Sequence, residues 1–246
     1  MIWYCPAERA PYLSEIDMEV IYEDNHILVV VKPQNVPVMP DITKDKDMVT
    51  LCKEYIKHTA QKSGNVYLGL LHRLDRPTGG VMVFAKTSKA ASRISQAIRE
   101  GEVEKYYLAV LVGAPKEKHG RLTHYLLKDP KANAVKIVPI ATEGAKKAML
   151  EYWIAGEYNK ISLAKIKLIT GRPHQIRVQM SSLNTPVLGD TKYGGNMMPK
   201  GINLALWACE LKLYHPVTKV KMSFRCYPPE GKPWEHFSGI IKSILL

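Results

Sequence analysis

The alternation of hydrophobic and polar positions has the period of short strands over most of the chain. A polar turn at residues 23–26 separates two apolar runs, 20–22 and 27–31, and this pattern predicts a hairpin. In residues 88–100, apolar positions recur every three or four residues and Gly101 follows directly, which predicts a helix that ends there. The pattern therefore predicts both strands and helices.

The remaining predicted elements are mainly strands. Strand-like runs lie at residues 81–85, 103–112, 135–140, 148–154, 161–169, 204–213 and 220–224. Short helices are predicted over residues 50–59 and from Pro173, because proline is tolerated in a first helical turn. A change of apolar parity within 161–169 predicts a bulge. Many strands without regular strand–helix alternation predict an α+β fold, with a mixed, mainly antiparallel sheet flanked by helices and loops.

No repeat, low-complexity tract or linker divides the sequence. We expect an irregular segment at residues 1–15 and one domain over residues 16–246. No apolar run approaches the ~20 residues that cross a bilayer. The N-terminus has no signal-peptide pattern, so we expect a cytoplasmic protein with four free thiols. Disulfides in a secreted chain are the alternative.

Charge separates the possible function classes. Lys and Arg number 35 against 23 Asp and Glu, a net charge of +12, and this excess points to a polyanionic partner such as RNA or DNA. A merely basic surface is the alternative. The sequence has no C-x-x-C pair, P-loop or dinucleotide fingerprint, so neither a metal nor a nucleotide cofactor is expected.

One segment combines charge with a tight turn. In residues 70–80, Asp75 lies between Arg73 and Arg76, and a Pro-Thr-Gly-Gly turn leads into an apolar strand. Neighbouring cations favour an ionised carboxylate, and a glycine-rich turn lets a ligand approach the backbone. On this segment alone, a structural turn with a salt-bridged Asp is the better interpretation.

Two further clusters lie in the second half of the chain. Arg172, His174 and Arg177 stand at the predicted start of the short helix, where N–H groups and cations suit phosphate or carboxylate. A solvated basic face is the alternative, and His174 by itself is more typical of a structural hydrogen-bonding residue. Residues 188–195, which include Lys192, form a turn-rich loop that alone indicates no function.

Together these clusters resemble one known family, the RluA-type pseudouridine synthases. The block His-Arg-Leu-Asp followed by Thr-x-Gly-Val stands at residues 72–81. Further blocks follow the family order: Tyr-Glu-Asp with Lys-Pro at 22–33, Lys-x-Tyr-Leu-Ala at 105–109, Gly-Arg-x-His-Gln-Ile-Arg-Val at 171–178, Gly-Asp-x-x-Tyr-Gly at 189–194 and His-Pro-x-Thr at 215–218. This combination outweighs the separate structural interpretations.

Three positions depart from the family pattern. Gly79, Pro173 and Gln179 stand where Ser, Thr or Ser, and His are usual, which leaves local loop geometry and RNA contacts open. The N-terminal stretch is also too short for the S4-like RNA-binding domain of many relatives. We therefore expect a catalytic domain over residues 16–246 that finds its RNA alone or with help.

The resemblance implies isomerisation of uridine to pseudouridine in RNA, without metal or organic cofactor. By match to the family, Asp75 is the essential carboxylate, either as nucleophile on the sugar carbon or as base at the neighbouring sugar position. Arg177 is implied to be its cationic partner. Tyr107 is implied to stack on the uracil and to serve in removing the carbon-5 proton.

Ribosomal or transfer RNA is the implied partner. The residues expected to bind it are basic: Arg73, Arg76, Arg172, His174 and Lys192. In relatives, the residue matching Arg73 fills the gap left by the extruded nucleotide. We expect a monomer, because no heptad pattern is evident. Two alternatives stay open: a catalytically inactive RNA-binding protein on the same scaffold, and a glycoside or nucleoside hydrolase with a second carboxylate ~5 Å from the first.

Overall fold

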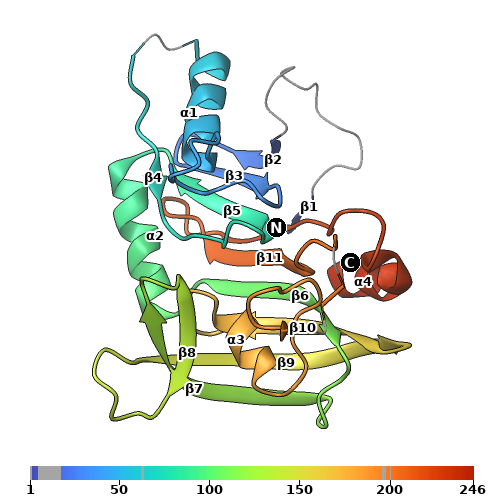
Figure 1. Cartoon of the computed structure of the whole chain (residues 1–246). Coiled ribbons are helices and arrows are strands. Elements are labelled where there is room, and N and C mark those ends of the chain that lie inside the picture. The colour runs from blue at the N-terminus through green and yellow to red at the C-terminus, as the bar shows by residue number, and fades with distance from the viewer. Residues whose placement is uncertain (1, 5–17, 62–63, 196–197, 200) are drawn as a thin grey trace. The chain divides into compact units, whose positions relative to one another are not determined.

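The structure is a computed structural model that describes residues 2–4, 18–61, 64–195, 198–199 and 201–246 (Figure 1). The chain forms two compact units. Unit 1 comprises Met1–Val103 and Cys209–Tyr227, and unit 2 comprises Glu104–Ala208 and Pro228–Leu246. A single domain over residues 16–246 stays a prediction.

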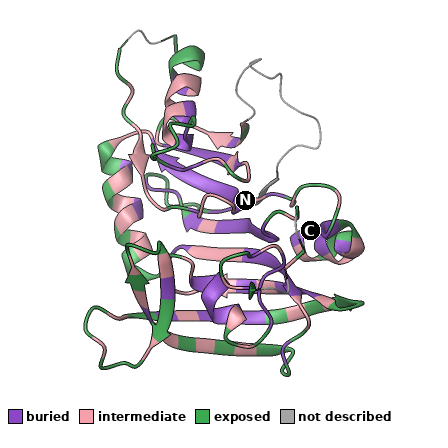
Figure 2. Ribbon diagram, in the orientation of Figure 1, coloured by how far each residue is buried: buried purple, intermediate pink, exposed green. Residues whose placement is uncertain are grey.

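Unit 1 contains a mainly antiparallel sheet. Its strands follow the order β2 (Glu19–Glu23), β3 (Ile27–Lys32), β5 (Gly79–Ala85) and β11 (Leu206–Tyr214), with β4 (Gly69–Leu70) on β5 and β12 (Lys221–Arg225) on β11. β5 is buried along its whole length (Figure 2), because all seven of its residues are small or apolar. The predicted hairpin at residues 20–31 is confirmed as β2 and β3.

Unit 1 has two helices whose ends follow local sequence signals. The Asp47 carboxylate caps α1 (Met48–Thr59), and the Thr87 hydroxyl caps α2 (Ser88–Glu100). Gly101 ends α2 in the left-handed conformation, with φ of 77°. Both predicted helices are confirmed.

Unit 2 contains a second run of antiparallel strands. Their order is β6 (Glu104–Val112), β10 (Ile161–Leu168), β9 (Lys146–Tyr158), β7 (His119–Asp129) and β8 (Ala134–Val138). The pairing of β10 with β9 shifts register between Leu163 and Ala164, which confirms the predicted bulge. The helix α3 (Gln175–Ser181) packs against β7 and β8. A 3-10 turn, η2 (Trp234–Phe237), leads into α4 (Ser238–Leu245).

Three expectations about the elements were incomplete or wrong. Ile2–Tyr4, expected to be irregular, forms strand β1, which pairs in parallel with β12; residues 1 and 5–15 lie outside the described residues. Pro173 lies before α3, because His174 adopts φ of 52° and the helix begins only at Gln175. The sequence patterns also did not predict β7, η2 or α4.

The predicted fold class is confirmed. Strands outnumber helices, the strand pairs are mainly antiparallel, and helices flank the strands, so the fold is α+β with a mixed sheet. In the described part of the chain, no helix is long and apolar enough to cross a membrane.

Candidate active site

Asp75 lies in the turn that leads into β5. Its carbonyl accepts a hydrogen bond from the Thr78 N–H at 2.9 Å, and Gly80 follows with φ of 120°, a conformation that favours glycine. The His72 Nε2 accepts a hydrogen bond from the Val83 N–H at 3.1 Å, which attaches the His-Arg-Leu-Asp block to β5. Backbone hydrogen bonds therefore fix the part of the chain that carries the Asp75 carboxylate.

Lys32, the last residue of β3, holds the same turn from the core. Its side chain is fully buried, and Nζ donates hydrogen bonds to the carbonyls of Pro33 at 2.9 Å, Arg76 at 2.9 Å and Thr78 at 2.8 Å. These three acceptors match the three N–H groups of an ammonium. Burial lowers the pKa of Lys32 to about 7, while the Asp75 carboxylate raises it. The buried Lys32 side chain therefore interacts electrostatically with Asp75.

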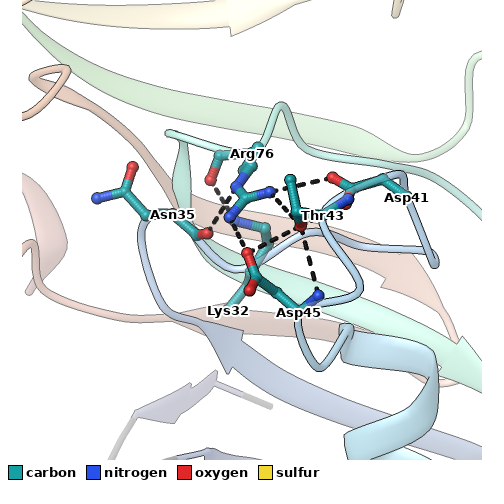
Figure 3. Close-up of polar contacts among 6 residues, drawn as sticks. All are labelled: Lys32, Asn35, Asp41, Thr43, Asp45 and Arg76. Atoms are coloured by element: carbon teal, nitrogen blue, oxygen red, sulfur yellow. Dashed lines mark hydrogen bonds and ion pairs between the residues drawn. The ribbon is translucent and has the colours of Figure 1, made fainter.

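Arg76 points away from the core and connects the turn to the loop before α1 (Figure 3). Its Nε donates to the Asn35 carbonyl at 3.0 Å, and its Nη1 contacts the Asp41 carboxylate at 3.1 Å and the Thr43 hydroxyl at 3.0 Å. Its Nη2 forms an ion pair with Asp45. The hydrogen bond to Asp45 raises the pKa of Arg76, and hydrogen bonds from Thr43, followed by the contacts with Arg76, lower the pKa values of Asp41 and Asp45.

The tyrosines of β6 point to opposite sides of their strand. Tyr107 is 6% exposed and stands opposite Ile166 of β10, whereas Tyr106 stands opposite Lys167, whose Nζ lies 5.8 Å from the Tyr106 ring centroid. Directly opposed residues of an antiparallel pair share a face. Tyr107 therefore belongs to the apolar face of β6, and Tyr106 to a basic one.

In unit 2, the Arg177 guanidinium is held by a buried carboxylate. Its Nε donates to Asp190 Oδ2 at 2.7 Å and its Nη2 to Asp190 Oδ1 at 2.8 Å. The Asp190 side chain is fully buried and also accepts the backbone N–H groups of Lys192 at 3.0 Å and Tyr193 at 3.1 Å. A two-point pair of this kind fixes the orientation of the guanidinium plane as well as its charge.

His174 and Tyr193 form a second contact beside this pair. The His174 Nδ1 lies 2.7 Å from the Tyr193 hydroxyl, which accepts the Val135 N–H at 2.8 Å, and the Arg177 Cζ lies 5.2 Å from the Tyr193 ring centroid. This arrangement supports a structural role for His174. A contact of His174 with RNA stays a prediction.

The other predicted RNA-binding residues have less constrained surroundings. Arg73 is exposed, Arg172 Nε donates to the Lys147 carbonyl at 3.0 Å, and Lys192 Nζ donates to the Asn133 carbonyl at 2.7 Å. Arg73 belongs to unit 1, whereas Arg172 and Lys192 belong to unit 2.

Each unit contains one of the predicted catalytic charges together with an oppositely charged residue that interacts with it. Asp75 belongs to unit 1 with Lys32, while Tyr107 and Arg177 belong to unit 2 with Asp190. Sequence reasoning did not single out Lys32 or Asp190. Both residues lie in sequence blocks that match the family. Lys32 also gave a further signal, because it is the one charged residue of the otherwise apolar strand Ile27–Lys32.

The described residues include free thiols but no cluster of metal ligands. Among them, no group of three His, Cys, Asp or Glu side chains is arranged to hold a metal ion. Cys52, Cys209 and Cys226 are buried free thiols, and Cys5 lies outside the described residues.

Comparisons with known proteins show to which family the chain belongs. Residues 26–182 match the family model described as RNA pseudouridylate synthase. The chain is 34% identical over 228 residues to an uncharacterized RNA pseudouridine synthase of Aquifex aeolicus, covering 88% of this chain and 71% of that protein. It is 32% identical over 231 residues to ribosomal large subunit pseudouridine synthase D of Yersinia pestis, covering 88% and 69%.

The fold also matches a solved structure. Human RNA pseudouridylate synthase domain containing 4 superposes with a TM-score of 0.74 at 24% identity, covering 91% of this chain and 92% of that one. The sequence match carries the assignment, and the structural match supports the fold. The chain belongs to the RNA pseudouridylate synthase family.

Proposed function

We propose that this RNA pseudouridine synthase isomerises uridine to pseudouridine in structured ribosomal or transfer RNA, with Asp75 as its essential carboxylate. The carrying observation is the Asp75 turn, in which a backbone hydrogen bond and the buried Lys32 side chain hold the part of the backbone that carries this carboxylate. The family match over residues 26–182 includes this turn.

The chemistry requires an ionised carboxylate and little else. The bond from the sugar to nitrogen 1 of uracil breaks, the uracil turns, and a bond from the sugar to carbon 5 forms. The product is an isomer of the substrate, so no oxidant, reductant or hydrolytic water is consumed. In both open roles, nucleophile and base, Asp75 must be deprotonated.

Tyr107 and Arg177 complete the proposed catalytic set. After carbon 5 bonds to the sugar, it still carries a proton, and we assign the removal of this proton to the Tyr107 hydroxyl. The Arg177 guanidinium supplies a fixed positive charge that supports the Asp75 carboxylate. Its orientation is set by Asp190.

RNA binding is assigned to the basic side chains that the sequence indicated. We propose that Arg73 replaces the extruded uridine in its stack, and that Arg172, His174 and Lys192 contact phosphate or base. We further propose that the protein acts in the cytoplasm as a monomer. We also propose that it uses no metal or organic cofactor, because a balanced isomerisation needs none.

The test is to incubate uridine-containing RNA with the wild type and with Asp75→Asn, digest it to nucleosides and quantify pseudouridine. We expect pseudouridine from the wild type and none from Asp75→Asn, with RNA affinity within about tenfold, or ~1.4 kcal/mol. Asp129→Asn is the matched control, because Asp129 caps a surface turn between β7 and β8.

Each other outcome contradicts the proposal in a different way. Near-wild-type pseudouridine formation by Asp75→Asn would remove Asp75 from the mechanism. Free uracil from the wild type would indicate hydrolysis, and RNA binding without any product would indicate an inactive scaffold.

A further inference from the structure

The loop between β3 and α1 is attached to the Asp75 turn at several points. We call residues 34–46 the clamped loop. At its start, the Asn35 N–H donates to the Arg76 carbonyl at 2.9 Å and the Gln34 Nε2 donates to the Pro77 carbonyl at 3.0 Å. The Arg76 guanidinium then holds the far part of the loop (Figure 3). Hydrogen bonds and ion pairs therefore attach the loop to the Asp75 turn at both its start and its far part.

The tip of the clamped loop is also ordered internally. The Asp41 carboxylate accepts the Thr43 N–H at 2.9 Å and the Thr43 hydroxyl at 2.6 Å, and the Thr43 Oγ1 lies 2.9 Å from the Asp45 carboxylate. Beyond the loop, Asp47 caps α1 through the N–H groups of Val49 and Thr50. The backbone on both sides of residue 42 is thus fixed by hydrogen bonds.

This ordered tip presents an apolar side chain to solvent. Ile42 is 99% exposed, and its two neighbours, Asp41 and Thr43, both contact Arg76. Met39 in the same loop is 47% exposed. A single exposed apolar residue on a free surface has little meaning. Ile42, in contrast, lies between two residues that contact Arg76, the residue that follows the proposed catalytic carboxylate.

The charge of the loop is compatible with a polyanionic partner because cations offset its carboxylates. Asp41 and Asp45 would repel phosphate, but the Arg76 guanidinium offsets one of their two negative charges and Lys44, in the same loop, offsets the other. The Arg76 N–H groups that donate to these acceptors do not contact phosphate. Its donors at Nε, Nη1 and Nη2 are directed at loop acceptors.

We infer that the clamped loop is an RNA-contacting element, in which Ile42 packs against an unpaired nucleobase beside the target uridine and Arg76 is the residue that positions the loop. The inference rests on the proposed function. An aliphatic side chain such as that of Ile42 can pack against the face of a nucleobase. Arg76 acts through Asp41 and Asp45 and does not bind a phosphate itself.

The first test measures KM and kcat for pseudouridine formation by Ile42→Ala and Ile42→Asp at several salt concentrations. We expect KM to rise roughly fivefold for Ile42→Ala and more for Ile42→Asp, with kcat within about twofold. The slope of log affinity against log salt stays unchanged for Ile42→Ala, because no phosphate contact is lost. Val220→Asp, at a 47% exposed apolar position in unit 1, is the control and should leave KM unchanged. An unchanged KM in both Ile42 variants would overturn the inference.

The second test uses Asp41→Asn/Asp45→Asn, which removes two negative charges and loosens the clamp. If Arg76 positions the loop, KM for RNA rises roughly fivefold despite the more positive charge. If Arg76 binds phosphate and the two acids merely compete for it, RNA binding becomes tighter, which contradicts the inference. Circular dichroism confirms that each variant is folded. A wild type without pseudouridine formation would instead contradict the proposed function, so the two failures are distinguishable.

Discussion

The two units differ in how they use charge. In the sequence of unit 1, 17 Lys and Arg stand against 14 Asp and Glu, whereas in unit 2 the numbers are 18 and 9. Unit 2 therefore carries a net charge of +9 of the total +12, and unit 1 carries +3. In unit 1, several cations also form ion pairs. Arg76 pairs with Asp41 and Asp45, and Arg225 pairs with Glu210.

This difference suggests a division of work. We propose that the larger positive charge of unit 2 supplies most of the electrostatic attraction for the phosphate backbone of RNA, and that unit 1, at +3, contributes less. Each unit also holds its proposed catalytic charge in a different way. Asp75 lies near Lys32, whose buried side chain donates hydrogen bonds to backbone carbonyls of the turn. Arg177, in contrast, donates hydrogen bonds to the buried Asp190 carboxylate. The following predictions test this comparison, beginning with the largest expected effect.

Arg177→Ala should damage unit 2 and catalysis together. It leaves the fully buried Asp190 carboxylate without its cation, and breaking a buried pair costs about 3–5 kcal/mol. We expect the free energy of unfolding to fall by that order and single-turnover pseudouridine formation to fall at least ~10²-fold. Urea titration and rapid quench of the folded variant measure the two effects. Arg177→Lys retains the charge but loses the two-point geometry, so an intact turnover in this variant would show that orientation is unimportant.

Tyr107→Phe should lower turnover by at least ~10²-fold, because it removes the hydroxyl assigned to the carbon-5 proton. RNA affinity should stay near wild type, since the ring remains. Tyr106→Phe is the matched control and should be nearly silent, because Tyr106 faces Lys167 on the other side of β6. If Tyr106→Phe were the damaged enzyme, the assignment of faces would be reversed. Single-turnover assays of both variants on one RNA decide this.

Lys32→Met should weaken the Asp75 turn, because the carbonyls of Pro33, Arg76 and Thr78 lose their donor. We expect turnover to fall roughly tenfold, or ~1.4 kcal/mol in the barrier. The pKa of Lys32 is about 7, and a neutral amine has only two N–H groups for three acceptors, so wild-type turnover should decline as pH rises through about 7. That decline should be absent from Lys32→Met. A pH–rate profile identical in both proteins would exclude Lys32 from positioning the turn.

The same lysine has the opposite effect on stability. Its pKa is lowered on folding from the ordinary 10.5, so above pH 7 the unfolded chain binds more protons than the folded one. The contribution of Lys32 to the free energy of unfolding therefore rises with pH up to about 10.5, while the full cost of burying the charge applies below pH 7. Urea midpoints of wild type and Lys32→Met across this range check the sign.

The smallest expected effect concerns single phosphate contacts. Arg172→Gln in unit 2 should reduce the slope of log RNA affinity against log salt by about 0.7, with little change in kcat. Lys57→Gln, an exposed position of α1 in unit 1, should leave the slope unchanged. The wild-type slope should be steeper than about −2. Equal effects of the two substitutions would contradict the division of charge between the units.

Sequence patterns predicted the elements of unit 1 better than those of unit 2. The buried strands β3 and β5 are continuous apolar runs, and α2 has both a Thr87 cap and a terminal glycine. In contrast, β7 has one buried residue, Leu126, so its alternation between half-buried and exposed positions carried no clear apolar signal. The start of α3 was predicted too early because the left-handed His174 breaks the helix after Pro173, a conformation that no local rule assigns to histidine.

For the site, residue identity was predictable and partnership was not. The family blocks led to Asp75, Tyr107 and Arg177, whose catalytic roles stay predictions. The Asp190 partner of Arg177 lies 13 residues further along the chain and becomes evident only when the loop after α3 folds back. Lys32 and Arg76 are 44 residues apart, so their contact likewise depends on tertiary structure.

The assembly of unit 1 from two separate stretches has a consequence for synthesis on the ribosome. Residues 1–103 leave the ribosome first, but β12 and most of β11 belong to residues 209–227, which follow only after most of unit 2 has been translated. At about 5–20 residues per second, this interval lasts roughly 5–20 s. During that time the edge of β5 that later receives β11 lacks its partner strand, and unpaired strand edges invite wrong pairing. The nascent chain thus carries an incomplete sheet through much of its translation, a period in which chaperones that bind unpaired strands would protect it.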